Sequence, residues 1–155
     1  MNPRPKNIGD VLAIVRDDII KPKLNCEIQR INSRYGDRIV LPEVTEKAVK
    51  LNLLEVSNIT PFVCIEANGI EPRSNKGQVA KVFNLNVFLG LMPINKAGDD
   101  DTIACYRYEE AITNTFKNYD CALFDLKYEN SEIGAMQRGN HVVYGILCRF
   151  SCSIV

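Results

Sequence analysis

The side chains best suited to chemistry in this chain are those of six cysteines and one histidine, His141. The cysteines stand at positions 26, 64, 105, 121, 148 and 152. No two of them form a Cys-x-x-Cys pair, so the sequence has no zinc spacing. Cys148 and Cys152 would lie about 13 Å apart on one face of a strand, which is too far for a disulfide. We therefore expect six reduced, buried or half-buried thiols in a reducing cytoplasm.

The acidic residues and the glycines form no catalytic pattern. The pairs Asp17-Asp18 and Glu109-Glu110 fall on predicted helices and are typical of solvated faces. The run Asp99–Asp101 lacks EF-hand spacing and precedes a predicted helix, whose dipole it favours. His141 has no clear serine or cysteine partner, and the isolated glycines form no phosphate-binding loop. The sequence thus predicts no catalytic residue, no cofactor and no metal ion, and a protein that is not an enzyme.

Composition and charge narrow the class of protein. The chain has 155 residues, 46% hydrophobic and 25% charged, which is typical of one soluble globular domain. Its 19 basic and 19 acidic residues cancel, so no global field attracts nucleic acid or an anionic membrane. No apolar run approaches the roughly 18 residues that span a bilayer. We expect no membrane partner, no sequence-specific nucleic-acid partner, no signal peptide, and a flexible N-terminal arm at residues 1–7.

Helical periodicity dominates the N-terminal part of the chain. Apolar residues at helical spacing predict one bent helix or two consecutive helices over Ile8–Tyr35. Asp10 is expected to cap the start, Pro22 to kink or split the segment, and Gly36 to end it. Residues 37–58 leave alternatives open. Their first part is a short strand or an extended loop, and their second part is a short helix or another strand.

The rest of the chain alternates between strands, loops and one helix. Period-two patterns predict four strands: Ile59–Ala67, Val79–Met92, Cys121–Tyr128 and His141–Ile154. Turn residues and charges predict three exposed loops: Asn68–Gln78, Pro93–Asp101 and Glu129–Asn140. A helix is expected over Thr102–Asn118. This order predicts a single α+β domain with a four-stranded, mostly antiparallel sheet and helices packed on one face.

Two predicted strands, Val79–Met92 and His141–Ile154, are unusually long. A 14-residue strand reaches about 46 Å, whereas a compact domain of this length is about 39 Å across, so these strands should bend or project. The alternative is a strand broken by a bulge inside a monomer. Apolar residues of these strands are candidate contacts between subunits: Phe83, Leu85, Leu89, Leu91, Val142 and Tyr144. Charged residues of the loops are candidate interaction residues: Arg73, Lys76, Asp99, Asp100 and Asp101.

The order and lengths of these elements resemble one known family. The segments that carry the likeness are the N-terminal helical stretch, Ile59–Ala67, KVFNLNVFLGL, YRYEEAITNTFKN, LFDLKYEN and the terminal VVYGILCRFSCSIV. Together they resemble the tail terminator, or tail completion, proteins of long-tailed bacteriophages. The resemblance runs from about Ile8 to the end of the sequence and rests on element order, lengths and the long last strand.

The resemblance implies a structural virion protein. Such a subunit forms a sixfold ring at the head-proximal end of the tail, stops tail-tube polymerisation and joins the tail to the neck. The implied partners are further copies of the chain, the tail tube protein and neck or head connector proteins, and contacts with a sheath terminator stay open. Assembly would take place in the host cytoplasm. The alternatives are another head–tail connector or neck subunit, a small enzyme or a ligand-binding domain.

Overall fold

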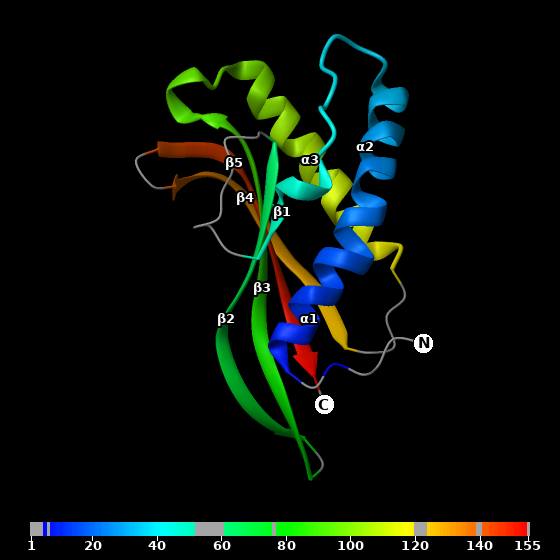
Figure 1. Ribbon diagram of the computed structural model, residues 1–155, viewed down its shortest axis with the longest axis vertical. Helices are drawn as coiled ribbons and strands as arrows, with labels where there is room; N and C mark the ends of the chain where they lie inside the picture. The colour runs from blue at the N-terminus through cyan, green and yellow to red at the C-terminus, as the bar shows by residue number, and fades with distance from the viewer. Residues whose placement is uncertain are drawn as a thin grey trace.

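The chain folds into one sheet with its helices on one side (Figure 1). The structure, a computed structural model, describes residues 5, 7–51, 61–75, 77–119, 124–138 and 141–154, without the side chains of Asn75, Gln78, Arg138 and His141. The sheet has five strands in the order β1-β2-β3-β5-β4. The α+β class is confirmed. The expected four strands are present, and a fifth, parallel strand is added at one edge.

The N-terminal helices form a continuous segment whose middle part is wider than an α-helix. α1 (Ile8–Ile14) leads into a π-helical stretch, Val15–Ile20, and then into α2 (Lys21–Tyr35). The change of helix type directly precedes Pro22, whose ring would otherwise clash with a carbonyl one turn back. The predicted bend at Pro22 therefore takes the form of a widened turn.

Both ends of this helical segment have caps. The side chain of Asn7, and not that of Asp10 as expected, accepts the N-cap hydrogen bond, because Asp10 already lies in the first turn and donates its backbone N–H at 3.0 Å. Gly36 ends α2 as predicted, with φ +58° in the left-handed region. Of the expected flexible arm at residues 1–7, Pro5 is buried and Asn7 is this cap, and the other residues lie outside the described part.

The chain after Gly36 is an extended loop held against α2. Residues 37–45 have no regular structure, a 3₁₀ turn spans Glu46–Ala48, and β1 (Val49–Lys50) pairs parallel with β2. The loop alternative is thus correct for the first part. Residues 52–58 of the uncertain stretch lie outside the described residues.

Two asparagines of α2 hold this loop through its backbone. Asn25 donates to the carbonyl of Val44 at 2.8 Å and accepts the Val44 N–H at 2.9 Å. Asn32, two turns later, makes the same pair of bonds with Leu41 at 3.0 and 2.8 Å. Each amide side chain satisfies both backbone groups of one loop residue, as a neighbouring strand would. We call these contacts the asparagine brackets.

The long strands pair as two hairpins. β2 (Phe62–Asn75) pairs with β3 (Gln78–Pro93), and β4 (Asp125–Arg138) pairs with β5 (His141–Ile154), all antiparallel. β3 and β5 then join the hairpins in the middle of the sheet. The expected strand starts Ile59 and Cys121 lie outside the described residues.

Two of the three predicted loops are wrong. Most of Asn68–Gln78 and of Glu129–Asn140 continues the hairpin strands. These parts are largely exposed on both faces, so no apolar alternation marks them as strands. The third, Pro93–Asp101, ends β3, makes a 3₁₀ turn at Ile94–Lys96 and begins α3 (Asp99–Lys117) three residues before the expected helix.

The core lies between the helices and one face of β3 and β5. The odd-numbered residues of β3 that were predicted to be apolar are buried there, with Cys148, Phe150 and Cys152 of β5. Cys64, Cys105, Cys148 and Cys152 are buried, as expected, whereas Cys26 is exposed, which contradicts the expectation of a buried or half-buried thiol there. Cys121 lies outside the described part of the chain.

Candidate functional site

The hairpin of β2 and β3 extends past the rest of the sheet. Ile154, the last residue of β5, pairs with Lys81, so beyond this point the two strands pair only with each other within the described structure. We call residues 69–75 and 77–81 the hairpin arm, of which residues 69–71 form the base, where β3 still pairs with β5. It leaves the body of the molecule as a two-stranded ribbon (Figure 1).

A bulge shapes the base of the arm. The pairing shifts between Asn68 and Glu71, and Gly69 there has φ +62°. A side chain at Gly69 would be strained by that φ, and its Cβ would stand 3.0 Å from the amide nitrogen of Asn84. Bulges bend a ribbon and increase its twist, and β2 curves away from the body in this region (Figure 1).

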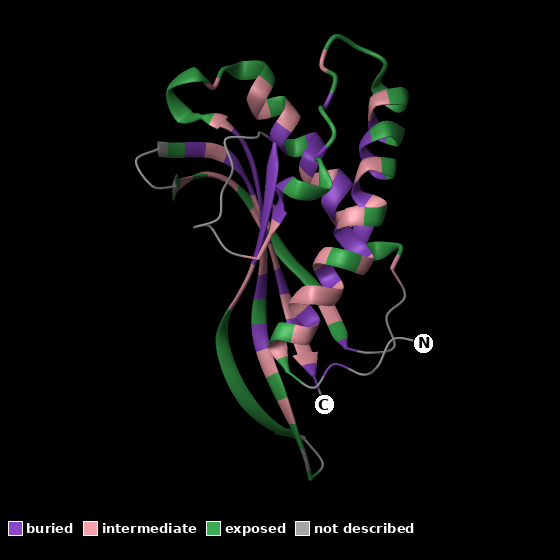
Figure 2. Cartoon of the chain, in the orientation of Figure 1, coloured by how far each residue is buried: buried purple, intermediate pink, exposed green. Residues whose placement is uncertain are grey.

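The arm is exposed on both faces (Figure 2). It carries two large apolar side chains in water, Ile70 at 57% and Val79 at 67% exposure. Arg73, predicted as an exposed loop residue, is exposed but belongs to strand β2, and Lys81 is exposed on β3. Lys76 lies outside the described residues. An exposed ribbon with apolar side chains is suited to contact another molecule.

A groove runs between α3 and β4, at the β4 edge of the sheet and on the face that the helices cover. We call it the α3–β4 groove. Its volume is about 420 Å³. Lining residues used below are Glu109, Asn114, Phe116, Tyr128 and Phe150.

Aromatic rings form the floor of this groove. The centroid of Phe150 lies 4.5 Å from that of Phe116 and 5.6 Å from that of Tyr128. The Tyr128 hydroxyl donates to a carboxylate oxygen of Glu109 at 3.2 Å and shares a hydrogen bond of 2.7 Å with Ser131. Burial raises the pKa of Tyr128, so the hydroxyl stays protonated and available as a donor at neutral pH. The groove thus offers an apolar floor with the carboxylate of Glu109 at its edge and the ammonium group of Lys117 also in its lining.

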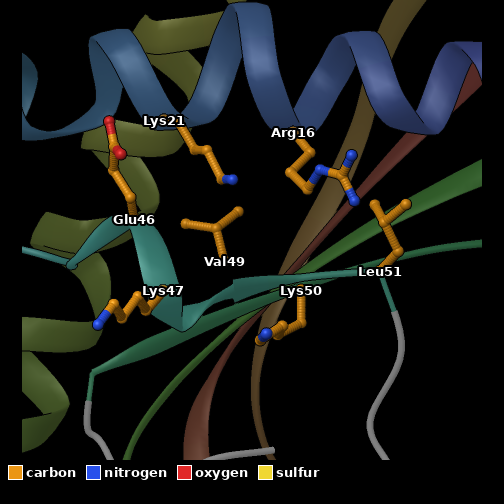
Figure 3. A pocket seen from close by; sticks show the side chains of 7 residues that line it. All are labelled: Arg16, Lys21, Glu46, Lys47, Val49, Lys50 and Leu51. Carbon is orange, nitrogen blue, oxygen red and sulfur yellow. The ribbon is translucent and has the colours of Figure 1, made fainter. Parts of the chain in front are cut away.

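A second hollow, of about 440 Å³, lies between the first helical segment and the chain that leads into β1 (Figure 3). Arg16 and Lys21 point into it from the helix, whereas Lys47 and Lys50 point away. Arg16 and Lys21 also contact Asp17, at 2.8 and 3.5 Å. The cations are therefore partly neutralised and do not converge on one point.

The candidate subunit contacts occupy two different places. Phe83, Leu85, Leu89 and Leu91 are buried in the core of the chain itself, so they are not a surface for a second copy. The helices cover this apolar face, which the sequence argument left partly uncovered. Val142 is exposed, and Tyr144 is half-buried with its hydroxyl 2.8 Å from that of Thr102.

The acidic run is the first turn of a helix and not part of an exposed loop. Asp99, Asp100 and Asp101 begin α3, where a carboxylate favours the positive end of the helix dipole. Asp101 accepts the backbone N–H of Gly98 at 2.8 Å, and Asp100 pairs with Arg38 at 2.9 Å. The alternative in which these residues cap the helix is therefore correct.

The described residues contain no group of three or more His, Cys, Asp or Glu placed to hold a metal ion. None of the helices described is long and apolar enough to cross a membrane. The arm and the groove were missed by the sequence analysis. Their residues come from segments interpreted as loop or core, and no local motif marks a surface built from separate elements.

No model of a protein family matches this chain, and no curated protein matches it.

Proposed function

We propose that this chain is a structural subunit of a bacteriophage tail. It forms a ring at the head-proximal end, stops the growth of the tail tube and joins the tail to the neck. The observation that carries the proposal is the hairpin arm with its exposed Ile70 and Val79. An isolated two-stranded ribbon is marginally stable in water, so an arm of this kind gains stability by packing on another molecule.

The edges of the sheet support assembly from like subunits. Within the described residues, β1 pairs with β2 at Val63 and Cys64 alone, and no strand pairs with the outer edge of β4. Edges of this kind are places where a further strand or chain packs. Because the two edges differ, contact between them is head to tail, and repetition by a fixed rotation closes a ring. The number six, the tail tube partner and the neck partner come from the family resemblance.

The experiment uses the full chain, alone and mixed with purified tail tubes. We expect native mass spectrometry to give one closed oligomer, most simply a hexamer, and electron microscopy to show rings on one end of each tube. A variant with the arm replaced by a short turn should stay monomeric and leave the tubes without caps. Val40→Lys is the control, since Val40 is an exposed apolar residue away from the arm.

Two results would count against this role. Only monomers or twofold dimers, even with tail tubes present, would contradict the ring. Rings that bind isolated heads or necks and ignore tube ends would replace the terminator role by that of a head–tail connector.

A further inference from the structure

The arm and the α3–β4 groove complement each other. We propose that the arm of one copy of this chain docks into the α3–β4 groove of the next copy. The inference rests on the proposed assembly of like subunits and names the two surfaces that make the contact. The following steps derive it from the described residues.

One face of the arm is both apolar and basic. In the ribbon, Val79 stands opposite Ser74, and Lys81 opposite Pro72, so these four side chains share a face. It continues the face of β3 that carries buried Phe83 in the body. Beyond Phe83 this face is uncovered in the described structure, and Val79 is 67% exposed. The arm therefore presents an apolar side chain beside a cation.

The groove presents an apolar floor and the carboxylate of Glu109, and one cation, Lys117, also belongs to its lining. Its floor is the ring cluster of Phe116, Phe150 and Tyr128, and Tyr128 is 43% exposed. The Glu109 carboxylate lies at its edge, held by the Tyr128 hydroxyl. A volume of about 420 Å³ leaves room for more than one side chain. Val79 would cover the aromatic floor while Lys81 meets Glu109.

The contact must join two molecules. In the strand order β1-β2-β3-β5-β4, the arm belongs to β2 and β3, and the groove lies along β4, with β5 between them. The arm also points away from the body (Figure 1), so it does not fold back into its own groove. A contact between two different surfaces of one chain is head to tail, which is the kind that can close a ring.

Disulfide trapping between differently tagged chains tests the contact. Both chains carry Cys26→Ser, which removes the thiol that is exposed among the described cysteines, and Cys121→Ser, since Cys121 lies outside the described residues. One also carries Val79→Cys and the other Asn114→Cys, and the mixture is oxidised mildly at high concentration, alone and with tail tubes. We expect a crosslinked heterodimer, identified by peptide mapping. The matched control pairs Val40→Cys with Asn114→Cys, since Val40 is 66% exposed and lies away from the arm.

A charge exchange gives an independent readout. Lys81→Glu and Glu109→Lys should each weaken association about threefold or more, and the double variant should recover most of the loss. Circular dichroism checks that each variant is folded. Val79→Lys should weaken association at least tenfold, and Val40→Lys should leave it unchanged.

The outcomes separate this inference from the proposed function. A Val79–Asn114 crosslink together with rescue by the charge exchange supports the docking. Rings whose crosslinks map to other surfaces overturn the docking and leave the ring assembly standing. Absence of the crosslink both alone and with tail tubes also overturns it, and the tail role is then decided by whether the protein is found at tube ends.

Discussion

The side chain of Arg107, which is 10% exposed, links α3 to the loop that follows α2. Its guanidinium donates to both carboxylate oxygens of Asp37, at 2.8 and 2.6 Å, and to the carbonyl of Ile39 at 3.1 Å. It also lies 3.8 Å from the centre of the Tyr35 ring. The sequence analysis did not single out Arg107, because its partners come from a distant loop with no periodic pattern.

The Arg107–Asp37 pair should make the free energy of unfolding depend on pH in the acidic range. The hydrogen bonds from Arg107 lower the pKa of the Asp37 carboxyl from 3.8 to about 2. The stabilisation is therefore complete above pH 3.8 and disappears as the pH falls toward 2. We expect Asp37→Asn to lower the free energy of unfolding at neutral pH and to flatten its fall over this range, in urea titrations. Asp125→Asn, at an exposed site, is the control, and an equal flattening there would contradict the assignment.

The cysteines should differ sharply in reactivity. Burial raises the pKa of Cys105 and of Cys148 to about 12, so roughly one thiol in ten thousand is ionised at pH 8. Cys26 is exposed. We expect brief alkylation of the native protein, mapped by mass spectrometry, to modify Cys26 but not the four buried thiols at positions 64, 105, 148 and 152. Cys26→Ser should remove that product, and early labelling of Cys148 would show that the core opens readily.

A row of glycines crosses the sheet, and its members differ in how closely they are packed. Gly145 pairs with Gly90 on one side and with Gly134 on the other. A Cβ at Gly145 would lie 2.0 Å from the carbonyl oxygen of Leu89, whereas one at Gly134 meets nothing within 4 Å. We expect Gly145→Ala to lower the free energy of unfolding by about 2 kcal/mol or more. Gly134→Ala should leave it within about 0.5 kcal/mol, and equal losses in denaturant titrations would refute the packing argument.

At the scale of elements, the asparagine brackets replace a strand partner for the loop after α2. Removing the amide of Asn32 leaves the N–H and C=O of Leu41 without their partner. We expect Asn32→Ala to destabilise the fold by about 1 to 3 kcal/mol, and Asn25→Ala by a similar amount. Ser33→Ala, on the exposed side of α2, is the control. Hydrogen exchange should show faster exchange at Leu41 in Asn32→Ala and at Val44 in Asn25→Ala.

Elements with a buried, periodic face could be predicted from the sequence. The helix over Ile8–Tyr35 and the strands β3 and β5 were predicted because one side of each is in the core. The arm and the end of the β4–β5 hairpin were read as loops, since glycine, asparagine and charge occur there without alternation. β1 has two residues and is too short to show a period.

At the scale of the whole molecule, a long strand projects from the body as predicted, but most of the residues expected to make the contacts lie elsewhere. The predicted strands Val79–Met92 and His141–Ile154 were expected to bend or project, and β3 projects together with β2, which was predicted to be short (Figure 1). Most of the projecting part was predicted to be a loop, although Val79–Lys81 began a predicted strand. Phe83, Leu85, Leu89 and Leu91, which were chosen as contacts, lie in the core. A single sequence does not show which helix covers which strand. The ring itself stays a prediction.

The way the sheet is joined has a consequence for how fast the chain folds. Each hairpin pairs residues that are near one another in sequence. The pairing of β3 with β5, which we call the seam, joins distant residues, such as Lys81 with Ile154 and Pro93 with Val143. Closing this seam requires ordering the whole of α3 and the segment after it, an entropic loss that precedes any gain from the new contacts. We therefore expect the seam to form in the rate-limiting step. Gly145→Ala should then slow refolding in stopped-flow experiments, whereas Asn32→Ala should mainly speed unfolding.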